Sequence, residues 1–322
     1  MNYICVVTKI ITSIKKSALV KALKKITQKI VLPGFEQIAL YDVGNFFIKG
    51  IQHGAIPSRA SAVSFSFFLA LFPSIIFLFT LIPYIPIDNF QNMLFQMLRT
   101  VMSVSAFAAA QDTIAEIITQ PNKGLLSVGF ILALYFSTNG FNAMIGAFNR
   151  SYHDIESRSW IWQRLISILL VIIITSLLIL AIGIIVFTEK AIYHIFNEGL
   201  FETWLLLIGR WLVLFALCFS AISFIFYLAP SKKNRWKFFS AGSTFATVLS
   251  VLTSIGFSYF VNNFGNYNKL YGSIGTLIVI LMWIYFNCLV MILGFELNAS
   301  IHVAKNHKGK EIDFEGMEQN KE

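Results

Sequence analysis

Residues 271–299, YGSIGTLIVILMWIYFNCLVMILGFELNA, decide how this chain folds. No charged side chain lies between Lys269 and Glu296, and residues 274–295 are almost all apolar. As an α-helix rising about 1.5 Å per residue, those residues span roughly 33 Å, which is enough to cross a hydrocarbon core of about 30 Å. The stretch therefore predicts a transmembrane helix that ends on one ionisable residue, Glu296.

The composition of the whole chain extends this prediction. Of its 322 residues, 57% are hydrophobic and only 13% are charged, which excludes an ordinary soluble domain. Long continuous apolar runs favour helices over a β-barrel, whose strands alternate over about ten residues. We therefore expect an all-α, polytopic membrane protein with one membrane domain, residues 61–301. The six predicted spans are residues 63–82, 125–148, 165–187, 204–229, 238–260 and 274–297.

The segments that flank this domain are predicted to lie outside the bilayer. Residues 1–32 carry seven lysines among apolar residues that fall mostly three or four apart. This pattern predicts an amphipathic helix on an anionic membrane surface, and a partly disordered basic tail is the alternative. A second amphipathic piece follows at residues 41–53, so that residues 1–60 form one basic interfacial segment. The polar residues 302–322 are predicted to be a disordered tail.

The distribution of basic residues predicts the orientation in the membrane. Six spans place both termini on one side. That side holds twenty of the 25 Lys and Arg residues, in the N-terminal segment, the links 149–164 and 230–237, and the tail, whereas the three opposite loops hold four. By the positive-inside rule, both termini are cytoplasmic. The net charge of +9 is then accounted for by topology, and we expect no nucleic acid as a partner.

Polar residues inside the spans are candidates for a functional site. Three asparagines of the second span share one helical face, and hydroxyl residues do so along the fifth span. Lipid cannot satisfy these groups, so they face other helices or water. Helix packing is one interpretation, and a polar cavity between the second, fifth and sixth spans is the other. The residues that would line this cavity are Asn139, Asn142, Asn149, Ser243, Thr247, Ser250, Ser254, Asn287 and Glu296.

Two ionisable residues lie within a span or at its edge, where a charge is costly: at the bilayer centre it costs about 2.5–3.5 kcal/mol. Arg210 lies about two turns from the outer surface and can extend its side chain to water. Glu296 lies about one turn from the cytoplasmic edge, and its side chain is shorter. We therefore expect Glu296 to be either protonated or paired with a basic residue of the links. Arg150 and Arg210 are the candidate charge partners.

No combination of residues predicts catalysis. The five histidines are scattered without metal-ligand spacing, and Cys5, Cys218 and Cys288 show no paired spacing. The chain has no P-loop, dinucleotide-binding or GxSxG motif. We therefore expect a protein that is not an enzyme and that has no catalytic residue, metal or cofactor.

Short motifs occur in order at the ends of the spans. They are Arg59-Ala60-Ser61-Ala62 with Phe72-Pro73, Asn149-Arg150-Ser151-Tyr152, Tyr271-Gly272 and Gly294-Phe295-Glu296-Leu297-Asn298-Ala299. With these motifs, roughly residues 33–304 resemble the YihY/BrkB family, once labelled ribonuclease BN. The resemblance implies a six-span protein of the bacterial inner membrane, linked to serum resistance and virulence. The ribonuclease label is not supported by the residues, since RNA hydrolysis of that kind requires a metal cluster or an acid–base set on a soluble surface.

Two functions remain open at this point. The first is a transporter or flippase-like protein for an unknown small molecule or lipid, with its polar route between the second, fifth and sixth spans. The second is a scaffold or envelope-maintenance protein, in which the polar faces only hold helices together. A water-filled cavity that reaches the middle of the membrane would favour the first, and a dry, tightly packed bundle would favour the second.

Reporter fusions test the predicted orientation. Paired phosphatase and fluorescent-protein fusions after Gly124, Gly199 and Asn266 should report the outside, because these positions fall in loops poor in Lys and Arg. Fusions after Ser157, Asn234 and the C-terminus should report the cytoplasm. One fusion on the other side is enough to contradict the arrangement.

Overall fold

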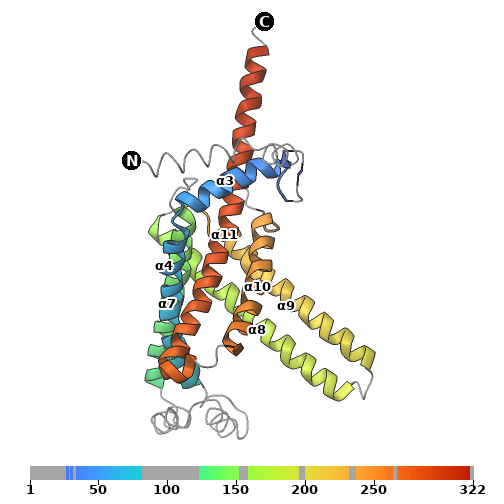
Figure 1. Cartoon of the computed structure of the whole chain (residues 1–322). Helices are drawn as coiled ribbons and strands as arrows, with labels where there is room; N and C mark the ends of the chain where they lie inside the picture. The colour runs from blue at the N-terminus through green and yellow to red at the C-terminus, as the bar shows by residue number, and fades with distance from the viewer. Residues whose placement is uncertain are drawn as a thin grey trace.

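The computed structural model describes residues 27–28, 30–31, 34–81, 123–151, 159–195, 200–231, 237–263 and 267–319. Within these residues every regular element is a helix, and six helices are long and apolar enough to cross a membrane. The predicted all-α, six-span fold is therefore confirmed (Figure 1). The amphipathic helix predicted for residues 1–32 lies almost wholly outside the described residues.

Helix α3 (Leu40–His53) forms where the second amphipathic piece was predicted, and it lies across one end of the bundle (Figure 1). This end is called the α3 end below. The first span begins at Ile56, earlier than the predicted residue 63. Pro57 is compatible with the first turn of a helix, and Arg59 is paired with Glu296. The span can therefore include both residues. The spanning helices are α4 (Ile56–Leu81), α7 (Lys123–Asn149), α8 (Trp160–Ile195), α9 (Leu200–Leu228), α10 (Ala241–Asn263) and α11 (Tyr267–Gln319).

Helix α11 is central to the bundle, where it packs against α3, α4, α7 and α10 (Figure 1). It continues beyond the membrane domain to Gln319, whereas residues 302–322 were predicted to be a disordered tail. Extending an existing helix is much easier than nucleating a new one, and residues 302–319 contain no proline. The helix therefore propagates into a polar sequence.

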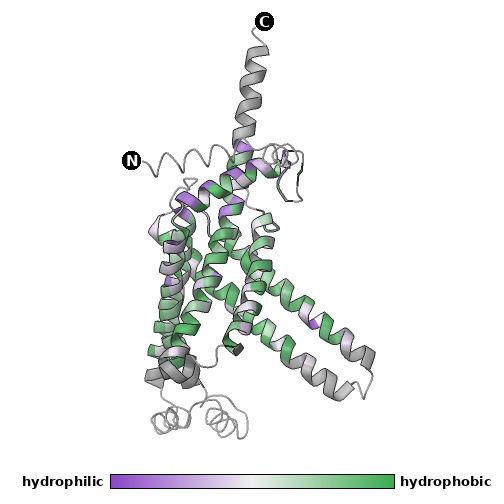
Figure 2. Ribbon diagram, viewed as in Figure 1, coloured by the Kyte–Doolittle hydropathy of each residue, from purple (hydrophilic) through white to green (hydrophobic). Residues whose placement is uncertain are grey.

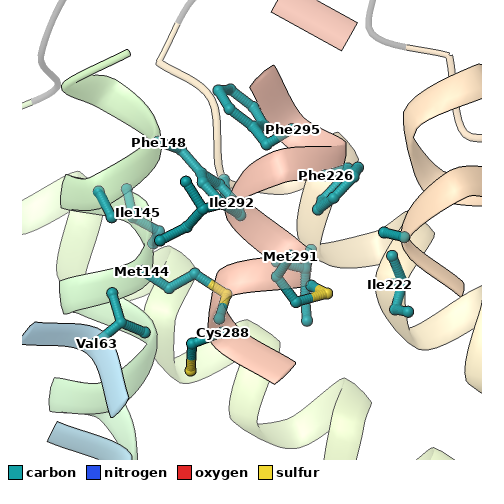
Figure 3. Close-up of a cluster of buried hydrophobic side chains, with 14 of the residues drawn as sticks. Val63, Met144, Ile145, Phe148, Ile222, Phe226, Cys288, Met291, Ile292 and Phe295 are labelled. Carbon is teal, nitrogen blue, oxygen red and sulfur yellow. The ribbon is translucent and has the colours of Figure 1, made fainter. Parts of the chain in front are cut away.

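The core of the bundle is built on three phenylalanines from three helices (Figure 3). Phe148 of α7 stacks on Phe295 of α11 with ring centroids 4.2 Å apart, and Phe226 of α9 meets Phe148 edge-on at 5.6 Å. Ile145 and Ile292, both fully buried, pack beside them. Aromatic pairs of this kind contribute about 0.5–1.5 kcal/mol beyond the area that they bury. This cluster fixes α11 against α7 and α9 one residue before Glu296.

The α8–α9 hairpin diverges from the other helices (Figure 1). In the most apolar stretch of α8 only 6% of the residues are buried inside the protein, and in that of α9 only 22%. The described part of the hairpin is mostly hydrophobic (Figure 2). An apolar helix that the protein itself does not cover must be covered by lipid tails. Most of the hairpin surface therefore contacts the bilayer.

Small residues let α10 and α11 approach closely near the α3 end. A side-chain carbon added at Gly242 of α10 would collide with the carbonyl oxygen of Gly294 of α11. The backbone N–H of Gly242 donates to Oδ1 of Asn298 at 2.8 Å, and Nδ2 of Asn298 donates to Oγ of Ser240 at 2.9 Å. Close backbone contact with one interhelical amide is typical of helix pairs in membranes.

A charge cluster joins the segment before α3 to α11. The carboxylate of Glu36 lies 2.6 Å from Nζ of Lys305 and 3.0 Å from Nζ of Lys237. The hydrogen bond from Lys305 is the main cause that lowers the pKa of Glu36 below its ordinary value, and Lys237 acts in the same direction. Because the folded-state pKa is lowered, this contact stabilises the fold at neutral pH and is lost as the pH falls through that pKa.

A pair of glycine substitutions in one helix tests the α10–α11 contact. Gly242→Ala should destabilise the protein by about 1–3 kcal/mol, the usual cost of overpacking. Gly256→Ala is the matched control, because no atom lies within 4 Å of the added carbon, and alanine favours a helix over glycine by up to about 1 kcal/mol. In thermal unfolding of detergent-purified protein, Gly242→Ala should melt lower and Gly256→Ala at the same temperature or higher. Equal melting of the two variants would refute close contact.

Candidate functional site

The side chain of Glu296 is fully buried at the α3 end of the bundle, where α3, α4, α7 and α11 meet. The hydroxyl of Ser151 donates to its carboxylate, lying 2.9 Å from Oε1 and 3.0 Å from Oε2. Nη1 of Arg59 forms a salt bridge with Oε2 at 3.5 Å. The carboxylate is thus neutralised by a cation from the start of α4 and hydrogen-bonded by a residue just after α7.

The corner between α3 and α4 closes this site. A side-chain carbon added at Gly50 would lie 2.5 Å from Oε1 of Glu296, so that the α3 backbone packs directly on the carboxylate and only glycine fits. Nη1 of Arg59 also donates to the carbonyl oxygen of Gly54 at 3.0 Å, in the turn that follows α3. A cation is favourable at this position, because the C-terminal end of a helix carries partial negative charge.

The energetics of this pair point to a role other than stability. Removing two charges from water costs several kcal/mol for each ion, and well-packed apolar residues of similar volume are often at least as stable. The side chain of Arg59 is only 7% exposed and that of Glu296 is 0% exposed. Ionisable groups kept inside a membrane domain in this way commonly mark a pathway or a binding site.

Two of the asparagines predicted to line a cavity contact α8. Nε2 of Gln163 donates to Oδ1 of Asn142 at 2.7 Å, and Nη1 of Arg164 donates to Oδ1 of Asn139 at 2.5 Å. The guanidinium of Arg164 also lies 4.9 Å from the ring centre of Tyr135. The sequence places Gln163 and Arg164 in a link, whereas α8 begins at Trp160 and includes both. In the structure these amides join α7 to α8.

The hydroxyl residues predicted in the fifth span mostly serve their own helix. The backbone N–H of Ser243 donates to Oγ of Ser240, and the N–H of Ser240 donates to Oγ of Ser243, each at 3.1 Å. This reciprocal pattern caps the start of α10. Oγ1 of Thr247 donates to the carbonyl oxygen of Ser243 at 2.7 Å. Ser250 is buried and Ser254 is half-buried on the same helix.

The remaining two candidates lie in different surroundings. Nδ2 of Asn287 donates to the carbonyl oxygen of Trp283, one turn earlier in α11. Asn149, the last residue of α7, has a buried carboxamide whose nitrogen and oxygen find no hydrogen-bond partner in the described part of the chain. It lies two residues before Ser151. Of the nine predicted residues, Glu296 and Asn149 therefore lie at the α3 end without simply joining or capping helices.

Neither predicted charge partner forms the salt bridge described above. Arg150 is exposed, and its Nε donates to the carbonyl oxygen of Gly146. Arg210 lies sixteen residues before Phe226 on α9, which places it about 24 Å along the helix from the Phe226–Phe295 contact, too far to reach Glu296. Its guanidinium lies 5.7 Å from the ring centre of Trp211. The partner in the structure is Arg59.

Sequence reasoning missed the roles of Arg59, Ser151 and Gly50. The first two belong to the motifs Arg59-Ala60-Ser61-Ala62 and Asn149-Arg150-Ser151-Tyr152, which flank spans at the same predicted membrane surface as Glu296. That shared level was the available signal for their meeting. Gly50 offered no signal, because its requirement arises only from the packing of α3 on α11.

Fold and site together define a polytopic α-helical membrane protein with a buried ion pair at one end of its bundle. The chain belongs to the family described as Virulence factor BrkB, whose model matches residues 47–316. It is 33% identical over 253 residues to the ribonuclease-like protein YfkH of Bacillus subtilis, covering 77% of this chain and 90% of that protein. It is 24% identical over 267 residues to the UPF0761 membrane protein NTHI0384 of Haemophilus influenzae, covering 82% and 96%. No solved structure matches the chain.

A double-mutant cycle tests the ion pair. Arg59→Gln alone and Glu296→Gln alone should each destabilise the protein by about 3–5 kcal/mol, because each leaves one buried charge without its partner. The double variant should lose less than the sum of the two, because both charges are then absent. Thermal unfolding in detergent provides the measurement. Additive losses would contradict a direct interaction.

The contact between Glu36 and Lys305 is the matched control, because Lys305 is 53% exposed. Exposed ion pairs contribute only about 0–1 kcal/mol, so Lys305→Gln should change the melting temperature far less than either buried substitution.

Proposed function

We propose that this protein is a flippase-like transporter of lipids. The site around Glu296 would be the polar binding site at the cytoplasmic end of its transport path. The observation that carries the proposal is the fully buried Glu296, held by Arg59 and Ser151 where four helices meet. A bundle that only had to be stable would do as well with apolar residues there. A protein that guides a polar group past the membrane boundary needs such a site.

The weak coverage of three spans supports access from the bilayer. In the most apolar stretches of α8, α9 and α10, only 6%, 22% and 11% of the residues are buried, so each of these helices has a face that lipid can reach. Helix α10 carries Ser250 and Ser254 between its capped start and its outer half. These hydroxyls are buried or half-buried, so in this proposal α10 must move before a lipid headgroup can pass along that face with its tails in the bilayer.

The proposed surroundings are the bacterial inner membrane, with both termini in the cytoplasm and the basic N-terminal segment on anionic lipids. Support comes from the uneven distribution of Lys and Arg, and from relatives that are bacterial proteins. On this orientation the α3 end faces the cytoplasm, and Glu296 lies near the inner headgroups.

A ribonuclease activity is not part of the proposal, although YfkH bears a ribonuclease-like name. The carboxylate of Glu296 is fully buried, under the backbone of Gly50 and against the hydroxyl of Ser151. RNA hydrolysis needs acid–base groups at a surface that an RNA strand can reach from water. This carboxylate lies inside the membrane domain and is paired with arginine.

A scaffold function is the second candidate, and specific contacts favour it. Asn139 and Asn142 join α7 to α8, and Asn298 joins α11 to α10. Three amides within the spans are thus used for helix packing, as a scaffold requires. On this account Glu296 would matter for stability only, and no lipid would cross.

Lipid movement in proteoliposomes separates the two candidates. With fluorescent phosphatidylglycerol and phosphatidylethanolamine as probes, the wild-type protein should make inner-leaflet label accessible to an external quencher at a rate that rises with protein content. Glu296→Gln should lower this rate at least tenfold. Ser176→Ala is the control, because this exposed serine of α8 bonds only to its own helix. If neither probe moves faster than in empty liposomes, the flippase proposal is wrong and the scaffold is favoured.

A further inference from the structure

One edge of the buried Arg59 guanidinium has no partner in the structure. Nη1 is engaged, donating to the carbonyl oxygen of Gly54 at 3.0 Å and lying 3.5 Å from Oε2 of Glu296. Nε and Nη2 are both buried, and neither has a hydrogen-bond partner among the described residues. The side chain as a whole is 7% exposed. Arginine donors are rarely left unpaired at this depth, because an unpaired buried donor loses its hydration without compensation.

The two unpaired donors are the pair best suited to an oxyanion. In a guanidinium group the N–H bonds of Nε and Nη2 lie side by side and point in one direction. Together they match two oxygens bound to a single carbon or phosphorus atom. Because Gly54 and Glu296 hold Nη1 on another side of the group, the protein already orients this edge.

The local charge leaves room for one anion. Arg59 and Glu296 neutralise each other, so the pair carries no net charge that would repel an anion. Asn149, two residues before Ser151, has a carboxamide whose nitrogen and oxygen are also buried without a partner among the described residues.

We propose that the Nε–Nη2 edge of Arg59 binds the phosphate of a ligand, through two oxygens of that phosphate. Arg59 is the fourth residue of the first span, at the level where the headgroups of the inner leaflet begin. A phosphodiester has two non-bridging oxygens, as the edge requires. If the phosphate is that of a transported lipid, this inference rests on the proposed function. Because both nitrogens are buried, the phosphate enters only when the packing around Arg59 loosens, as in a transport cycle.

Binding to detergent-purified protein tests this assignment. The probes are inorganic phosphate, a short-chain phosphatidylglycerol and acetate, measured by calorimetry and by the shift in melting temperature. Wild-type protein should bind phosphatidylglycerol and melt higher in its presence, and acetate should have no comparable effect. Binding of phosphatidylglycerol alone identifies a lipid phosphate as the source, whereas equal binding of inorganic phosphate identifies free phosphate as sufficient. No binding of either phosphate compound, or equal binding of acetate, overturns the proposal.

Two arginine-to-lysine variants locate the site. Arg59→Lys keeps the positive charge beside Glu296 but removes the paired donors, so affinity for the phosphate compound should fall at least tenfold. Arg150→Lys is the matched control, since Arg150 is exposed and lysine preserves its charge, and its affinity should stay within twofold of wild type. Unchanged affinity in Arg59→Lys overturns the proposal. If Arg59→Lys does not fold, the wild-type titrations still decide whether phosphate binds.

The binding and the proteoliposome experiments together separate this inference from the proposed function. If phosphate binding is absent but labelled lipids still cross proteoliposomes, the phosphate assignment fails and the flippase proposal stands. If phosphate binds at Arg59 but no lipid crosses, the binding site stands and the transport proposal fails.

Discussion

The buried carboxylate of Glu296 is the constraint on which the α3 end of this bundle depends. A charge with no exposure to water must find a cation and hydrogen-bond donors within the protein. Arg59 and Ser151 supply them from the start of one span and the end of another. Gly50 is then required, because α3 must cross directly over the carboxylate. One ionisable residue thus explains how α3, α4, α7 and α11 are placed relative to one another.

The bundle divides into a firmly packed part and a loosely attached hairpin. Around α11, the stacked rings of Phe148 and Phe295 and the close contact of Gly242 with Gly294 leave little freedom. The α8–α9 hairpin is attached to this part near the α3 end, where Gln163 and Arg164 of α8 donate hydrogen bonds to α7. Beyond those contacts it is covered by lipid. Because Phe226 of α9 belongs to the core, only the part of the hairpin far from the α3 end can move without disrupting that core.

Polar residues within the spans have more than one purpose in this protein. Asn139, Asn142 and Asn298 join helices through their side-chain amides, whereas Arg59 and Asn149 keep buried donors that no group of the described residues accepts. The difference separates helix packing from candidate ligand recognition. For the asparagines this difference is visible only in their hydrogen bonds, because the residue type is the same.

The sequence by itself determined the all-α fold, the six spans and the amphipathic α3, because lipid enforces long apolar helices whose boundaries depend on local composition. It also marked Glu296 as a residue in need of a partner. Only the tertiary structure decided that this partner is Arg59 rather than Arg150 or Arg210, and that Asn139 and Asn142 meet α8. Helical periodicity tells which residues share a face, but not which helix that face meets. That choice follows from the packing of all the helices at once, as around Phe148, Phe226 and Phe295.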